Sequence, residues 1–207
     1  MLTLDRPRKT LFHGSRRFDA AARTWHDGAS ATGETIAPRD AVTWLQKESG
    51  HRLRTPVGVI GPRDARAEQL AIAEAIGAGL ARMGLALVCG GRQGIMEAVC
   101  RGSAAHGGIS IGLLPETEPD HANAFVTVPI ATGIGEARNA LVARAALCLV
   151  VIGDSYGTLS EVALGLQFGK RVFGLAGAAQ VNGVRPCANA DDALDGVARV
   201  ALAMQED

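Results

Sequence analysis

The sequence predicts an α/β protein: a Rossmann-like, doubly wound parallel sheet with helices on both faces. In residues 55–207, short apolar runs alternate with longer stretches in which apolar residues recur at helical spacing. The short runs are continuously apolar, as is typical of parallel strands buried on both faces. The chain is 47% hydrophobic and 20% charged, so it can bury a substantial core.

Strands and helices alternate along this region, except between the apolar runs at 109–114 and 125–128, and such alternation implies right-handed crossovers. The apolar runs predict strands at 56–61, 85–89, 109–114, 125–128, 147–152 and 171–175. The helical spacing predicts helices at 72–83, 94–106, 136–146, 158–168 and 191–204.

The composition changes near residue 55. Residues 1–54 contain many turn residues, one helical stretch at 38–48 and four of the eight aromatic residues. So short a segment cannot form an independent core. We therefore expect an N-terminal extension at 1–54, built of turns and one short helix, that docks on a nucleotide-binding domain at 55–207. A loosely ordered arm is the alternative.

Composition also narrows the class of protein. No apolar run has the length of a membrane span and no secretory signal opens the chain, so we expect a cytoplasmic protein away from membranes. The formal net charge is zero and no basic stripe is present, which argues against nucleic-acid binding. The cysteines show no metal-binding spacing and are interpreted as buried apolar residues, so no metal site is expected: Cys89, Cys100, Cys148 and Cys187.

Glycine-rich loops follow several of the predicted strands. Ligands of open α/β sheets bind beyond the carboxyl ends of the strands, so the loops at 61–64, 90–94, 129–138 and 153–158 should meet at one crevice. Two of these loops lead directly into helices, where free backbone N–H groups favour an anion. Tight strand–helix turns are the alternative for either loop alone, but the two together favour phosphate binding.

The common cofactor motifs are missing. No GxGxxG follows the first strand and no P-loop occurs, which disfavours NAD and ATP chemistry. Pyridoxal phosphate is also disfavoured, because the three lysines lie away from the expected crevice. No cofactor is therefore expected.

Two charged residues lie near the helix starts that face the crevice. Arg138 is placed to hold a phosphate or carboxylate. Glu161 is placed to act on a sugar or an attacking water, but residues 158–161 also match a capping box, in which Glu161 would only accept a backbone hydrogen bond. The spacing leaves both hypotheses open.

At these residues the region 57–175 resembles the Lonely Guy (LOG) family, long mislabelled as lysine decarboxylases. The family signature is a glutamate–arginine helix start followed by PGGxGTxxE. The chain has Gly-Glu-Ala-Arg at 135–138 and Gly-Asp-Ser-Tyr-Gly-Thr-Leu-Ser-Glu at 153–161, and residues 90–96 resemble the other glycine-rich loop. By this resemblance, Arg138 and Glu161 fall on the family's catalytic arginine and glutamate.

The chain departs from the family at one place. Gly153-Asp154-Ser155 replaces proline-glycine-glycine, and Asp154 brings a negative charge to the expected phosphate loop, although it could instead bind a ribose hydroxyl. The motif segments at 135–139 and 156–161 are most similar to a divergent branch of the family. That branch includes proteins resembling molybdenum cofactor carriers, which bind a phosphorylated pterin without converting it.

The resemblance implies a nucleoside 5′-monophosphate phosphoribohydrolase, in which Glu161 stabilises an oxocarbenium-like state and Arg138 holds the ligand. The alternative is a carrier or sensor that binds a phosphorylated ligand without turnover. The resemblance to the LOG family also implies a homodimer. The residues expected to contact the ligand or its phosphate are Gly61, Gly90, Gly91, Gly94, Met96, Gly135, Asp154, Ser155, Tyr156, Gly157 and Thr158.

Overall fold

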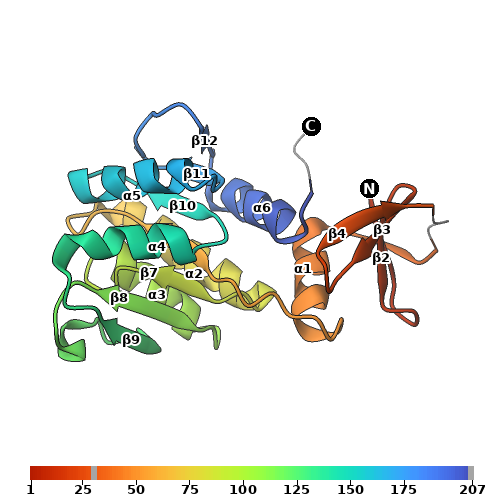
Figure 1. The fold of residues 1–207 in the computed structure, drawn as a ribbon, viewed down its shortest axis with the longest axis horizontal. Helices are drawn as coiled ribbons and strands as arrows, with labels where there is room; N and C mark the ends of the chain where they lie inside the picture. The colour runs from red at the N-terminus through yellow and green to blue at the C-terminus, as the bar shows by residue number, and fades with distance from the viewer. Residues whose placement is uncertain (29–31, 205–207) are drawn as a thin grey trace.

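A seven-stranded parallel sheet forms the centre of the larger part of the molecule, on the left in Figure 1. The computed structural model describes residues 1–28 and 32–204. Its strands lie in the order β12-β11-β10-β6-β7-β8-β9. They are β6 (Val57–Ile60), β7 (Leu87–Cys89), β8 (Ser110–Leu114), β9 (Val128–Ala131), β10 (Leu149–Ile152), β11 (Val172–Leu175) and β12 (Val184–Pro186).

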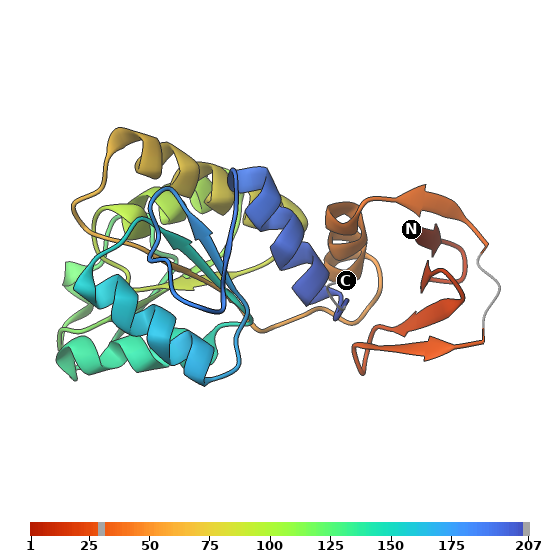
Figure 2. The same ribbon diagram turned by 90° about the horizontal axis from the view of Figure 1, so that it is seen from above.

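Helices cover both faces of this sheet, which confirms the predicted fold class (Figure 2). Helices α2 (Ala67–Met83), α3 (Ile95–Ala104) and α6 (Ala190–Ala201) share one apolar cluster with the sheet. Helices α4 (Asn139–Ala145) and α5 (Tyr156–Gln167) share the other. Strands between two such layers are buried on both sides, which is why their sequences are continuously apolar. None of the described helices is long and apolar enough to cross a membrane.

The predicted strand at 125–128 is wrong in position, since β9 occupies Val128–Ala131. The Asn123 side chain accepts a hydrogen bond from the Phe125 N–H, and the Val126 N–H donates to the Asn123 carbonyl. Residues 123–126 therefore form a turn that brings Val128 opposite Ile111. The apolar residues of this turn pack against the core without joining the sheet, and apolarity alone does not distinguish the two arrangements.

Helix α2 begins at Ala67 and not at the expected residue 72, and two helices at the crevice also begin elsewhere than expected. The stretch 136–146 is a short 3-10 turn, η2 (Gly135–Arg138), followed by α4. Helix α5 begins at Tyr156 and not at residue 158, because Ser155 is its N-cap. Both differences lie at helix ends, where capping side chains decide the boundary.

The N-terminal extension differs from the expected set of turns with one helix. It contains a five-stranded antiparallel sheet in the order β4-β3-β2-β1-β5, followed by α1 (Pro38–Lys47). Each strand has only three or four residues, too few for an alternating pattern to stand out in the sequence. They are β1 (Leu2–Asp5), β2 (Thr10–His13), β3 (Arg16–Asp19), β4 (Thr24–Asp27) and β5 (Glu34–Ile36).

The extension packs against the end of the core that carries α6 (Figure 2). Leu2, Leu4 and Trp44 are buried in the same apolar cluster as α2 and α6. The Arg39 guanidinium pairs with Asp195 at 2.6 Å, and the Trp25 indole N–H donates to the Leu202 carbonyl at 2.8 Å. Apolar contacts and polar bonds together hold the two sheets in one arrangement.

Candidate functional site

A small crevice lies at the carboxyl ends of the parallel strands. The chain runs outward from β6 through β7, β8 and β9, then returns to place β10 on the other side of β6. Ligands of open α/β sheets bind at such a switch point. The crevice has a volume of about 140 Å³ and is lined by Ile60, Gly61, Pro62, Arg63, Gly90, Arg92, Met96, Glu136, Arg138, Asn139, Ser155, Gly157, Thr158 and Glu161.

All four predicted loops contribute to this lining. Eight residues named from the sequence are brought together here: Gly61, Gly90, Met96, Arg138, Ser155, Gly157, Thr158 and Glu161. Sequence reasoning did not single out Arg63, Arg92, Glu136 or Asn139 as site residues. The first three could have been identified by their charge, because each lies in a loop that follows a strand. Asn139 had no identifying feature except its position next to Arg138.

Five other residues named from the sequence do not line the crevice: Gly91, Gly94, Gly135, Asp154 and Tyr156. At Gly94, φ is +71° and an added Cβ would lie 2.2 Å from the Arg63 carbonyl oxygen, so this glycine allows two loops to pack together. The side chains of Asp154 and Tyr156 are exposed, that of Tyr156 by 93%. The carboxylate of Asp154 is therefore not part of the crevice lining.

The start of α5 presents backbone N–H groups at the crevice. Ser155 is the N-cap, and its Oγ accepts from the Thr158 N–H at 3.1 Å. In this structure the Thr158 N–H, which we expected to bind phosphate, is therefore already satisfied, and its use for phosphate stays a prediction. Tyr156 and Gly157 precede the first intrahelical bond, from the Leu159 N–H to the Ser155 carbonyl, so their N–H groups remain as donors.

Gly157 borders open space. A Cβ added there would lie 3.9 Å from Ser155 Oγ and 4.0 Å from Asn139 Nδ2, which are ordinary contacts. Every other described glycine either has a left-handed φ or would place its Cβ within about 3.0 Å of another atom. The protein fold therefore does not require glycine at 157, and the absence of a side chain keeps part of the crevice empty.

Arg138 and Glu161 form a buried pair at the base of the crevice. Their side chains are 6% and 8% exposed, and Arg138 Nη1 lies 3.4 Å from Glu161 Oε1. The guanidinium packs flat against Gly90, where a Cβ would lie 2.5 Å from both terminal nitrogens. The Nε–H of Arg138 is buried and has no acceptor among the described residues. One donor of this guanidinium is thus unsatisfied.

The alternative that Glu161 belongs to a capping box is wrong. The N-cap is Ser155, which places Glu161 in the second turn of α5 and beyond the reach of the first N–H groups. Its carboxyl instead faces Arg138 from the neighbouring helix start. The buried contact with Arg138, and not helix capping, therefore accounts for the position of the Glu161 carboxyl.

Burial raises the pKa of the Glu161 carboxyl to about 8, against the opposing charge of Arg138 and with a smaller contribution from Glu136. At neutral pH the group is thus mostly protonated. The 3.4 Å separation from Arg138 agrees with this, since it is longer than the roughly 2.8 Å typical of charged pairs. A neutral Glu161 leaves the charge of Arg138 uncompensated.

The crevice carries an excess of positive charge. Arg63, Arg92 and Arg138 line it, with Glu136 as the carboxylate and Glu161 as a neutral acid. The guanidinium of Arg92 also pairs with Glu116 at 2.9 Å, which fixes its position. Positive side chains and the start of α5 together favour an anionic ligand.

Comparisons with known proteins find relatives of similar sequence and fold. An uncharacterized protein of Archaeoglobus fulgidus is 35% identical over 139 residues, which cover 67% of this chain and 91% of that protein. The molybdenum cofactor binding protein of Rippkaea orientalis has a similar structure, with 30% identity and a TM-score of 0.66 over 70% of this chain and 96% of that one. The molybdenum cofactor carrier protein of Chlamydomonas reinhardtii is also similar in structure, with 33% identity and a TM-score of 0.67 over 73% of this chain and 100% of that one.

The model of one family matches most of the chain. Residues 54–201 fit the SLOG cluster4 family, and residues 1–53 lie outside the match. The matched region contains the parallel sheet and every residue that lines the crevice. This chain therefore belongs to the SLOG cluster4 family.

Proposed function

We propose that the crevice binds the phosphate of a small organic ligand, and that the protein is a carrier for molybdenum cofactor. The observation that carries the proposal is the open space at Gly157. A glycine that the fold does not need, at the start of a helix and beside a buried arginine, suits a ligand that approaches the backbone closely.

The phosphate would be held first by three donors for which the described residues supply no acceptor. The Tyr156 and Gly157 N–H groups lie in the first turn of α5, where they can donate hydrogen bonds to an anion that the helix dipole also favours. The Nε–H of Arg138 needs an acceptor in the buried interior. A phosphate oxygen supplies that acceptor, and Arg63 and Arg92 add positive charge at the mouth of the crevice.

The protonation state of Glu161 favours holding a ligand over cleaving it. The hydrolase hypothesis requires an ionised carboxylate to stabilise a developing sugar cation. Burial raises the pKa of Glu161 to about 8 and so favours its neutral form, which lacks that charge. The names of the two solved relatives, a molybdenum cofactor binding protein and a molybdenum cofactor carrier, support the same class of ligand.

A second candidate function is hydrolysis of nucleoside 5′-monophosphates to the free base and ribose 5-phosphate. The observation in its favour is that a carboxyl with a pKa near 8 can donate a proton at neutral pH. Glu161 would then protonate the leaving base in place of stabilising the cation as a carboxylate.

Two measurements on the same purified protein separate these functions. Base release from a panel of nucleoside 5′-monophosphates reports hydrolysis, and the molybdenum and pterin contents report carriage. A carrier releases no base and retains molybdenum and pterin when it is produced in cells that make the cofactor. Base release that is lost in Glu161→Gln would instead assign the hydrolase.

We also propose that the protein is a homodimer. Large apolar side chains are exposed along β9 and α4, where Val128, Ile130 and Leu141 are 43%, 42% and 44% accessible. A second copy is one way of covering such a surface. Light scattering at micromolar concentration tests this, and a monomeric mass would contradict it.

A further inference from the structure

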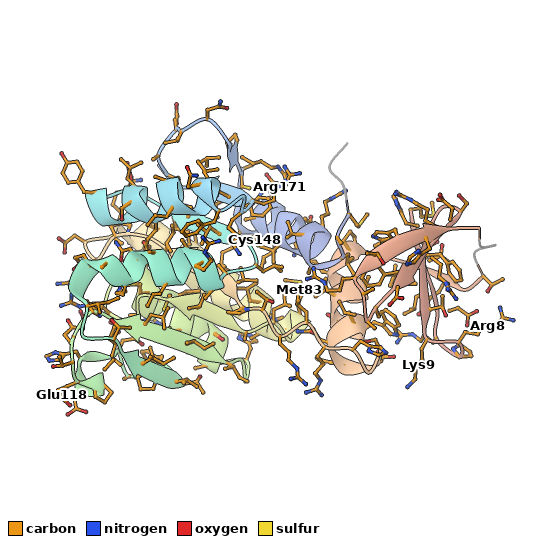
Figure 3. The ribbon with its side chains drawn as sticks, in the orientation of Figure 1. Arg8, Lys9, Met83, Glu118, Cys148 and Arg171 are labelled. Atoms are coloured by element: carbon orange, nitrogen blue, oxygen red, sulfur yellow. The ribbon has the colours of Figure 1, made fainter. Side chains whose placement is uncertain are left out.

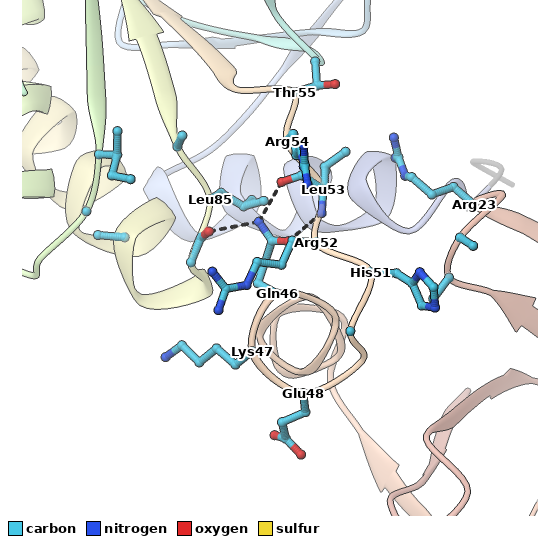
Figure 4. Close-up of a pocket in the computed structure, with 18 of the residues that line it drawn as sticks. Arg23, Gln46, Lys47, Glu48, His51, Arg52, Leu53, Arg54, Thr55 and Leu85 are labelled. Carbon is cyan, nitrogen blue, oxygen red and sulfur yellow. Dashed lines mark hydrogen bonds between the residues drawn. The ribbon is translucent and has the colours of Figure 1, made fainter. Parts of the chain in front are cut away.

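A second, larger groove lies where the N-terminal extension meets the core (Figure 4). We call it the junction groove; its volume is about 1080 Å³. One wall is the end of α1 and the linker after it, at residues 46–55. The floor is formed by residues 84–86, just before β7, and 107–109, just before β8. The junction groove is thus at the amino edge of the parallel sheet, opposite the crevice.

A buried glutamine holds the shape of this groove. Gln46 Oε1 accepts from the Leu53 N–H at 2.7 Å, and its Nε2 donates to the carbonyls of Leu53 and Gly84 at 3.1 and 2.9 Å (Figure 4). The side chain is 5% exposed, so these bonds are shielded from water. They fasten the linker to both α1 and the core.

The walls carry a one-sided charge. The cationic or basic side chains that line the groove are Arg23, Lys47, His51, Arg52 and Arg54. The carboxylate in the lining is Glu48, which is already bound to Arg6 at 2.6 Å. Arg52 and Arg54 are exposed, and neither forms an ion pair within residues 1–28 and 32–204. Two guanidinium groups therefore remain available at a fixed linker.

The floor, by contrast, is aliphatic. Leu85 and Ala86 lie beside Ile109, which is 53% exposed, and Leu53 packs partly against the core. Apart from His51, the lining residues within the described part of the chain carry no aromatic ring. Single-stranded nucleic acids are bound on aromatic stacking platforms, which this groove does not offer. An extended peptide with alternating acidic and aliphatic side chains matches both the walls and the floor.

We propose that the junction groove binds an acidic, aliphatic-containing segment of a partner protein. Carboxylates of the segment pair with Arg52, Arg54 and Lys47, and its apolar side chains cover Ile109. Because the groove and the crevice lie at opposite edges of the sheet, a partner can dock while the crevice is occupied. Residues 1–53, which lie outside the family match, supply most of the walls and so give this chain a surface that the family core alone does not form.

The test uses the full chain and a short fluorescent peptide of alternating glutamate and leucine. Anisotropy should show binding at low ionic strength that weakens as salt is added, because exposed charges are screened. Arg52→Glu combined with Arg54→Glu should weaken binding by about tenfold or more. Ile109→Ser should also weaken it, because it removes apolar surface without changing the charge, and this separates a peptide groove from general attraction to polyanions.

The matched control is Lys9→Glu combined with Arg17→Glu. It makes the same change in net charge at exposed residues outside the groove lining, of which Lys9 is labelled in Figure 3, and it should leave the affinity within about twofold. Thermal melts of both double variants should stay close to wild type, because Arg52 and Arg54 are exposed. Equal losses in the two double variants would overturn the proposal. Tighter binding of a single-stranded oligonucleotide than of the peptide would overturn it too.

Discussion

Replacing Gly157 by alanine should strengthen the fold and weaken ligand binding at the same time. Among the described residues, the added methyl group meets no atom closer than 3.9 Å, so it introduces no clash. Residue 157 lies in the first turn of α5, where alanine is a better helix former than glycine and restricts the unfolded chain more. The same methyl group projects into a crevice of only about 140 Å³.

The two effects have opposite signs and separable sizes. The substitution should raise the free energy of unfolding by about 0.5 kcal/mol, and by no more than about 1 kcal/mol. For a chain of this length that corresponds to a rise of roughly 1–4 °C in Tm. A phosphate excluded from close contact with the Gly157 N–H should lose about tenfold or more in affinity, equivalent to about 1.4 kcal/mol.

Thermal melts and calorimetric titration with AMP measure both quantities on one preparation. Tyr156→Ala is the matched control, since its side chain is 93% exposed while its backbone N–H is kept, and it should bind AMP as wild type does. A lower melting temperature for Gly157→Ala would show that glycine serves the fold. Unchanged affinity for AMP would show that no ligand approaches residue 157.

Other changes in the crevice have equally definite outcomes. Arg138→Lys should weaken AMP binding by about tenfold with folding retained, because lysine lacks the Nε–H and the planar fork; unaltered titrations would exclude Arg138 from the site. Glu161 takes up a proton on folding, since its pKa rises from 4.5 to about 8. The contribution of Glu161 to the free energy of unfolding is therefore complete below about pH 4.5 and is lost as the pH rises towards 8. Melts recorded at each pH should show Glu161→Gln becoming more stable relative to wild type across that interval. A difference in Tm between the two proteins that does not change with pH would contradict a buried, neutral Glu161. AMP affinity of wild type should fall as the pH rises through about 8, because ionised Glu161 offsets Arg138, and Glu161→Gln should not show that fall in titrations at each pH. Ser155→Ala should lower the free energy of unfolding by about 1 kcal/mol through loss of the N-cap, and AMP should restore part of it by binding the freed Thr158 N–H; melts with and without AMP check this.

The parallel sheet could be predicted because its strands are continuous apolar runs between glycine-rich loops. Strand ends then located the crevice, and Arg138 and Glu161 were singled out because they lie near helix starts that face it and match the family motif. The same reasoning failed at 125–128, where an apolar segment forms a turn held by Asn123. An apolar run indicates that a segment is buried, but a buried segment can be a turn as well as a strand.

Side-chain direction and local capping could not be read from the sequence. Asp154 and Ser155 are adjacent in the loop after β10, yet one is exposed away from the crevice and the other caps α5. The choice of Ser155 as N-cap also decides that Glu161 lies in the second turn and pairs with Arg138. The N-terminal sheet escaped prediction because its strands are too short for an alternating pattern.

The most direct test of ligand carriage is the content of the protein as purified from cells that make molybdenum cofactor. Molybdenum by mass spectrometry and pterin by fluorescence should both approach about one per chain, as expected for one site bound tightly enough to survive purification. Gly157→Ala prepared in parallel should retain markedly less of both, at unchanged or higher thermal stability. Wild-type protein that contains neither molybdenum nor pterin, and that releases the base from AMP, would contradict the carrier proposal.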